Sequence, residues 1–322
     1  MTVSQASSRQ LGALGFCAFS VPAVLLLPQV GWLWATLAAG AVAGLLLWAL
    51  YLQGRNPLPL AQTAARWKLG KGLLFLALLW NLLLLGAAAK ALSGIFPDGK
   101  HSPLVGLLLL LLAAYAAKHR RGARVAAILF FFLLGLYGLL FGFSLTELRP
   151  AYLTPERQVA PARLSAALAP LCLLYLSRGK GKGAAIWCMA GVALAFVAAF
   201  MTAGILSPTV VQQREFALYE AAKSVSIFGV IGRLEPLVSA ALSLGGFCLL
   251  YLICAANGQI LQAVFPEKKT VNFLINFFAG AAAIWLCGYV SAPWIALGTA
   301  IFWGLFPIGT LLVGTRKKVK KI

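Results

Sequence analysis

Acidic residues are scarce in this sequence. Only seven of its 322 residues are Asp or Glu, two are His, and charged residues of both signs make up 11% of the chain. A soluble domain carries about a quarter charged residues, so the shortage excludes a soluble globular enzyme and a disordered chain. The chain is instead 61% hydrophobic, with a mean hydropathy of +0.91. Apolar runs long enough to cross a bilayer give such values, and they predict an integral membrane protein.

The cysteines lack the spacing of a metal, redox or disulfide framework. None of the six forms a CxxC pair, none has a His beside it, and each lies in or near an apolar run. Such cysteines are typical of small buried residues. We therefore expect no metal and no cofactor. The six residues are Cys17, Cys172, Cys188, Cys248, Cys254 and Cys287.

Positive charge is abundant and is distributed in a pattern. The net charge of +20 would suggest a nucleic-acid partner in a soluble protein. Here the basic residues lie between apolar runs, where they set orientation in the membrane. We expect a lipid bilayer as the surroundings and no nucleic acid as a partner.

Ten apolar spans are predicted within one integral membrane domain, 1–322, whose halves are about 1–150 and 151–322. The fourth and sixth spans are shorter than the roughly 20 residues of a straight crossing, so each needs flanking residues or an irregular backbone. The spans are 11–29, 31–53, 72–96, 104–117, 123–143, 163–177, 184–206, 236–256, 271–288 and 293–314.

The loops orient these spans. With the N-terminus inside, nineteen of the 27 Lys and Arg residues fall on the inner side, and six of the seven acids fall outside. This is the positive-inside pattern, and it predicts that both termini are cytoplasmic.

Two loops also contain helical patterns. Pro57–Gly70 suits a short interfacial helix on the inner side, and the stripe through Leu218 and Val225 suits an outer helix. That outer helix is either a rim element or a lid over an outward-facing vestibule.

Prolines inside spans predict irregular backbone. Pro22 and Pro170 lack the N–H that the carbonyls of Ala18 and Ala166 would accept in a helix. They lie in the first and sixth spans, which begin two halves of opposite orientation. We therefore predict an all-α inverted five-plus-five repeat with broken helices 1 and 6, the arrangement that frames a transporter midplane site. Ordinary proline kinks are the alternative, and Pro307 is expected to be a kink near the end of the last span.

The chemistry available at mid-membrane is polar and uncharged. No Asp or Glu falls mid-span, so no catalytic centre is expected and the chain is not predicted to be an enzyme. Free N–H groups suit a carboxylate and loosened carbonyls suit an ammonium or Na⁺, so a small zwitterion satisfies both. Small and polar residues of the kinds that could bind it also commonly pack membrane helices against one another. The candidate binding residues are Ser20, Pro22, Trp80, Asn81, Ser165, Pro170, Ser243 and Gly246.

Several stretches resemble one family, the endospore germination permeases, which are the B subunits of spore germinant receptors in the amino acid–polyamine–organocation superfamily. Ala217–Gly246 is similar to the family's outer-loop helix and eighth membrane helix, including an Arg-x-acid pair, here Arg233 and Glu235. Ala113–Leu140 resembles its fourth and fifth helices, and Ser8–Phe16 the polar start of its first.

The resemblance implies a ligand, partners and a location. It implies ten helices in the inverted arrangement, a small neutral amino acid as ligand, and a complex with receptor A and C subunits in the spore inner membrane. Arg233 and Glu235 would then be structural or partner-facing residues. Two other functions remain open from the residues themselves: a secondary amino-acid transporter in the cell membrane, and an assembly subunit that binds no ligand.

Overall fold

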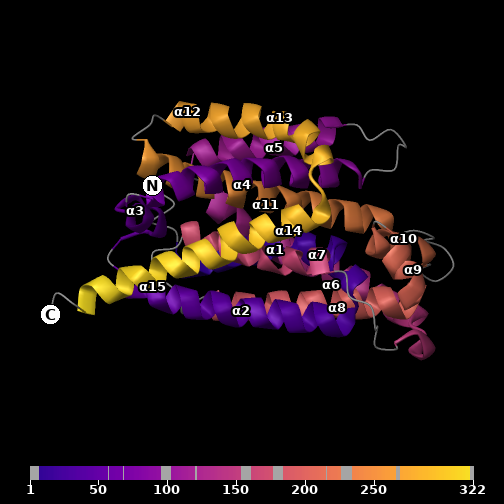
Figure 1. The fold of residues 1–322 in the computed structure, drawn as a ribbon. Coiled ribbons are helices and arrows are strands. Elements are labelled where there is room, and N and C mark those ends of the chain that lie inside the picture. Colours follow the sequence, from indigo (N-terminus) through magenta and orange to yellow (C-terminus); the bar gives the residue numbers. More distant parts are fainter. Residues whose placement is uncertain are drawn as a thin grey trace.

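The structure is a computed structural model. It describes residues 7–56, 58–67, 69–95, 103–119, 122–153, 161–176, 184–214, 216–225, 234–265 and 269–319, and the described part is helical throughout, without strands. Figure 1 shows long helices side by side in one bundle. The two ends of the chain lie at the same end of the bundle as α3 (Leu60–Ala65), whereas α9 (Pro208–Gln213) and α10 (Ala217–Ser224) lie at the opposite end.

Each predicted span coincides with a helical segment. The ends agree within a few residues, except that the eighth and tenth segments extend further at their C-terminal ends. The segments are α1 (Ser8–Leu25) with the 3₁₀ helix η2 (Leu27–Val30), α2 (Trp32–Gly54), α4 (Gly70–Ser93), α5 (Pro103–His119), α6 (Gly122–Ser144), α7 (Pro161–Leu164) with η5 (Ser165–Tyr175), α8 (Ala184–Leu206), α11 (Glu235–Val264), α12 (Lys269–Leu274) with η6 (Ile275–Ala279) and α13 (Gly280–Leu286), and α14 (Ala292–Thr299) with η8 (Ala300–Leu305) and α15 (Phe306–Val319).

The outer faces of these helices suit a bilayer. Among the described residues, seven helices are long and apolar enough to cross a membrane, and α5 and Ala162–Tyr175 are shorter apolar helices. Large apolar side chains such as Phe131 and Leu305 point outward and are 70% exposed. Exposed Trp34, Tyr289 and Trp294 lie near helix ends, where aromatic rings favour the membrane–water interface. The protein is therefore an integral membrane protein.

Eight of these segments pack in two groups of four. In one group, α1 and α2 each pack against both α8 and η5. In the other, α4 and α5 pack against each other and against α11, and α13 packs on α4. Figure 1 shows α4, α5 and α13 in the upper layer and α2 and α8 in the lower layer. The groups meet where α1 packs on α11, and these are the two most thoroughly buried helices.

Both loop helices expected from the sequence are present. The inner one, α3, buries Leu60, Ala61 and Ala64. The outer one, α10, buries Leu218 and Ala222 against neighbours that include α8, α11 and η2. Its contacts also reach α1. The two alternatives for this helix, a rim element and a lid, both stay predictions.

The backbone is irregular in span 6 but not at Pro22. η5 is an eleven-residue 3₁₀ helix with Pro170 inside it, although 3₁₀ runs are usually only three or four residues long. By contrast, α1 continues as one α-helix through Pro22 to Leu25. The expected break of helix 1 at Pro22 is therefore wrong for this conformation, and the helix changes type only after Leu25. Two π-helical segments, η6 and η8, were not predicted, and η8 ends two residues before Pro307.

Candidate functional site

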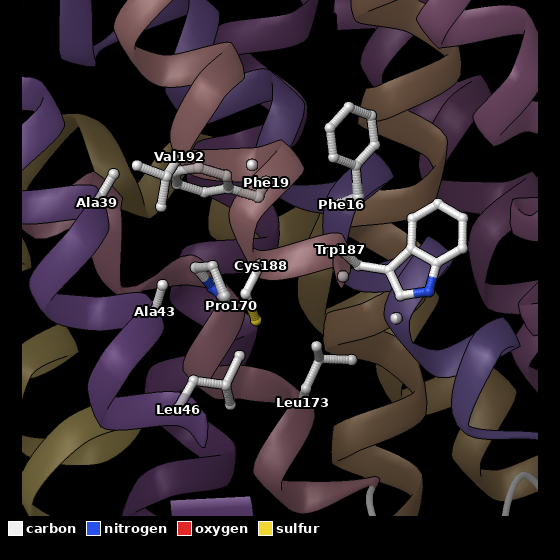
Figure 2. Close-up of a pocket in the computed structure, with 13 residues that line it drawn as sticks. Phe16, Phe19, Ala39, Ala43, Leu46, Pro170, Leu173, Trp187, Cys188 and Val192 are labelled. Carbon is white, nitrogen blue, oxygen red and sulfur yellow. The ribbon is translucent and has the colours of Figure 1, made fainter. Parts of the chain in front are cut away.

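An apolar pocket lies between α1, α2, η5 and α8 (Figure 2). Its cavity volume is about 30 Å³, and since one buried water needs at least ~10–15 Å³, it is far too small for an amino acid. Phe16, Phe19 and Trp187 surround it, and of the eight candidate residues only Pro170 lines it. Because the lining is apolar, this pocket does not hold the polar group of a ligand.

Ser20 lies at the junction of the two helix groups. Its side chain is fully buried, and its hydroxyl donates to the Cys17 carbonyl of its own helix at 2.7 Å. A Cβ placed on Gly245 of α11 would lie 2.5 Å from Ser20 Oγ. The junction therefore relies on a small residue that permits close helix approach. Ser20 and Pro22 are both buried in α1, and the hydroxyl of Ser20 already has a backbone partner.

Trp80 and Asn81 of α4 both reach the tenth span. The Trp303 indole Nε1–H donates to Asn81 Oδ1 at 2.8 Å. The Trp80 ring lies 6.0 Å from the Phe302 ring, and its edge packs against Gly298. Asn81 is 0% exposed, and neither its Nδ2 nor the buried Trp80 Nε1 has a protein hydrogen-bond partner among the described residues. Two adjacent residues thus present buried N–H groups that lack protein acceptors.

Two carbonyls of the irregular segments η5 and η8 accept hydrogen bonds from side chains of other segments. They are not the carbonyls of Ala18 and Ala166, which were expected to help hold a zwitterion. Gln53 Nε2 of α2 donates to the Leu174 carbonyl in η5 at 3.0 Å. The Tyr175 hydroxyl donates to the Phe302 carbonyl in η8 at 2.6 Å. Irregular backbone inside a membrane is tolerated where such side chains satisfy it. These bonds stabilise irregular η5 and η8 and leave the two carbonyls less available to a ligand.

The described hydrogen bonds do not connect the remaining candidates to Trp80 or Asn81. Ser165 and Ser243 donate within their own segments, to the carbonyls of Ala162 and Ser239, both at 2.7 Å. Gly246 instead makes room for the Leu92 side chain of α4. The described hydrogen bonds therefore do not join the eight predicted residues into one cluster.

Of the two residues assigned to partners, Arg233 lies outside the described residues. Glu235 begins α11 and accepts a hydrogen bond from the Tyr219 hydroxyl at 3.4 Å. Burial, reinforced by the nearby Glu235 carboxylate, raises the pKa of Tyr219. The phenol therefore stays protonated and able to donate, which joins α10 to the start of α11.

The site has no resident metal ligands. Within the described part of the chain, no group of three or more His, Cys, Asp or Glu side chains is placed to hold a metal ion. Two described carboxylates make polar contacts: Glu220 on α10 with Lys223, and Glu235 at the start of α11 with Tyr219. The chemistry of the buried site is that of neutral amides, indoles and hydroxyls.

Sequence comparisons identify no relatives. No protein-family model matches the sequence, and no curated protein matches it. Solved structures do match. A point mutant of the Eremococcus coleocola manganese transporter aligns with a TM-score of 0.63 and 16% identity, over 96% of this chain and 76% of that chain. The same transporter in complex with an aromatic bis-isothiourea substituted compound aligns with a TM-score of 0.60 and 17% identity, over the same shares. The chain therefore has the fold of a known membrane transporter.

Three residues at the site were not singled out from the sequence. Tyr175, Trp303 and Gln53 lie inside or at the edge of apolar runs, where each looks like ordinary packing. The available signal was their polar atoms, because a donor buried in a membrane helix requires a partner. Their partners lie more than 120 residues away in the chain, so the pairings required the structure.

Proposed function

We propose that the protein is a permease-like subunit of a spore germinant receptor, and that it senses a small neutral amino acid at the Trp80–Asn81 site. The observation that carries the ligand is the pair of buried N–H groups without protein acceptors, in the interior of a transporter fold. Polar residues inside a membrane are candidates for ligand contact, and Asn81 is one of the buried polar residues of the described interior. An uncharged site suits a ligand of zero net charge.

The topology we propose has ten membrane crossings with both termini in the cytoplasm. It is supported by the distribution of basic residues and by the N and C marks at the same end of the bundle in Figure 1. Substituted-cysteine labelling of intact cells tests it. Arg120→Cys and Lys318→Cys should resist an impermeant reagent, whereas Asp98→Cys and Arg214→Cys should react. Labelling of Arg120→Cys from outside would contradict the ten-span topology.

An inverted repeat is supported by how the helices pair. The first span packs on the seventh (α1 on α8), and its proposed counterpart, the sixth, packs on the second (η5 on α2). The fourth packs on the eighth (α5 on α11), and the ninth packs on the third (α13 on α4). When each span is replaced by its counterpart five positions along, the contact of the first with the seventh becomes that of the sixth with the second. The contact of the fourth with the eighth likewise becomes that of the ninth with the third. This is what an inverted five-plus-five arrangement requires.

The same contacts suggest how ligand binding changes the receptor. In η8, the Phe302 carbonyl accepts from Tyr175, which belongs to the first helix group. The next residue, Trp303, donates to Asn81 of the second group. Consecutive residues of one π-helical segment are thus bonded to both groups. A ligand at Asn81 that prefers one arrangement of the groups shifts the population toward it, and that differential affinity is the signal.

The receptor role itself rests on the resemblance of Ala217–Gly246 to the germination permeases. In the structure, α10 packs at the outer start of α11 and is joined to it through Tyr219 and Glu235. We propose that this outer segment faces the receptor A and C subunits in the spore inner membrane. Co-purification with those subunits, lost when Ala217–Ser224 is replaced by a flexible linker, tests the assignment.

Secondary transport of amino acids is the second candidate, and the transporter fold favours it. Proteoliposomes separate the two functions. Uptake of radiolabelled amino acid and ligand-dependent melting are measured on the same preparation. Binding without uptake supports the sensor, and uptake driven by an ion gradient supports the transporter. The absence of both binding and uptake would leave only the assembly role.

A further inference from the structure

The polar atoms left unpaired at the Trp80–Asn81 site share one chemical character. Both are N–H donors, Asn81 Nδ2 and Trp80 Nε1, and both are buried. The acceptors around them are already engaged: Asn81 Oδ1 accepts from Trp303, and the Phe302 carbonyl accepts from Tyr175. A buried donor without a partner is costly, about 1–3 kcal/mol. The site is therefore poised for a group that accepts hydrogen bonds.

We propose that Trp80 Nε1 and Asn81 Nδ2 hold the carboxylate of the ligand, and that the site does not bind a metal cation or an ammonium. This inference rests on the proposed function for the location of the ligand and adds which of its groups is recognised. It differs from the expectation that loosened carbonyls hold the ligand's ammonium. It also separates this site from that of a manganese carrier, because N–H groups repel a metal cation.

The surroundings limit which carboxylates fit. Trp80 lies against Phe302 and Gly298, so the donors are set among apolar groups. A lone anion in such surroundings is costly, and among the described residues no Lys or Arg forms an ion pair or hydrogen bond with this cluster to balance it. A ligand that carries its own ammonium solves this problem, because its net charge is zero. A zwitterionic amino acid, bound through its carboxylate, is the expected class.

The bond between Asn81 and Trp303 fixes the donor character of the site. An amide has one acceptor oxygen and one donor nitrogen. Because the Trp303 indole engages Oδ1, the Asn81 amide is held with its nitrogen toward the unpaired side. Trp303 is thus a positioning residue. Replacing it removes the bond that sets the amide orientation, and Asn81 then offers either atom to a ligand.

Acetate and methylammonium test the proposal without knowledge of the natural ligand. Melting of the purified full-length protein is followed in detergent at constant ionic strength, with each probe in turn. Acetate lacks an ammonium and should therefore bind weakly, so it is added at high concentration. There it should raise the melting temperature of wild type by about 2 °C more than that of Trp80→Phe or Asn81→Asp. Methylammonium should shift the melting temperatures of wild type and Trp80→Phe equally. It should stabilise Asn81→Asp more than wild type, because this variant replaces the donor amide with a carboxylate.

The control is a second indole of the same kind. Trp32 Nε1 is also buried without a protein partner, but its ring packs edge-on against Phe196 and Phe200. Trp32→Phe should therefore keep the full acetate shift.

Equal acetate shifts in wild type and Trp80→Phe would overturn the proposal, as would a wild-type preference for methylammonium. An acetate effect that depends on Trp80 without any amino-acid response keeps the carboxylate site and rejects the sensor. An amino-acid response that is independent of Trp80 keeps the sensor and rejects the carboxylate site.

Discussion

The first and sixth spans each carry a proline well inside the helix, yet their backbones differ. α1 remains α-helical through Pro22, whereas η5 is a 3₁₀ helix around Pro170. In α1, the Ser20 hydroxyl bonds to the Cys17 carbonyl of its own helix. In η5, Gln53 reaches the Leu174 carbonyl from a different helix. A proline removes one helical hydrogen bond, but a lasting irregular helix also needs outside donors for its carbonyls.

The largest expected effect comes from removing such an outside donor. Gln53→Leu leaves the Leu174 carbonyl buried without its partner, and the free energy of unfolding should fall by about 2–3 kcal/mol. Chemical denaturation in detergent measures it. Gln62→Leu on the exposed side of α3 is the matched control and should change stability little. A loss of similar size in both variants would show that the effect does not come from the Gln53–Leu174 hydrogen bond.

The two prolines sharpen the same comparison. Because α1 is already α-helical, Pro22→Ala restores an N–H for the Ala18 carbonyl and should stabilise the protein by about 1–2 kcal/mol. Pro170→Ala should change stability by less than about 0.5 kcal/mol, since the carbonyls of η5 are served from outside. Melting of the two variants beside wild type measures the difference. A larger gain for Pro170→Ala would mean that the proline, not Gln53, maintains the 3₁₀ backbone.

The sequence was a good guide to the helices and a poor guide to their contacts. Apolar runs indicated where the helical segments lie, including the seven described helices that are long and apolar enough to cross a membrane, because a membrane helix must be apolar along most of its length. Prolines located the irregular sixth span but wrongly suggested a break at Pro22. The π-helical segments and the Trp303–Asn81 bond left no pattern in the sequence, because they depend on which residues meet after folding. Trp80 and Asn81 were proposed from polarity alone, and the structure supplied their unpaired donors.

The smallest expected effect concerns Ser20. Its hydroxyl donates to a carbonyl of its own helix, so Ser20→Ala should lower the free energy of unfolding by about 0.5 kcal/mol or less. Ligand-dependent melting should be unchanged. A lost ligand response in Ser20→Ala would move the binding site from α4 and η8 to the junction of α1 and α11.

The most direct test of the central claim is amino-acid-dependent melting of wild type and Asn81→Leu. Small neutral amino acids are screened in detergent, with Ser243→Ala as the control, because Ser243 bonds within its own helix. We predict that at least one amino acid raises the melting temperature of wild type and Ser243→Ala by about 2–4 °C at saturation. Asn81→Leu should lose that shift while remaining folded. A shift retained in Asn81→Leu, or no shift in wild type with any amino acid, would contradict binding at the Trp80–Asn81 site.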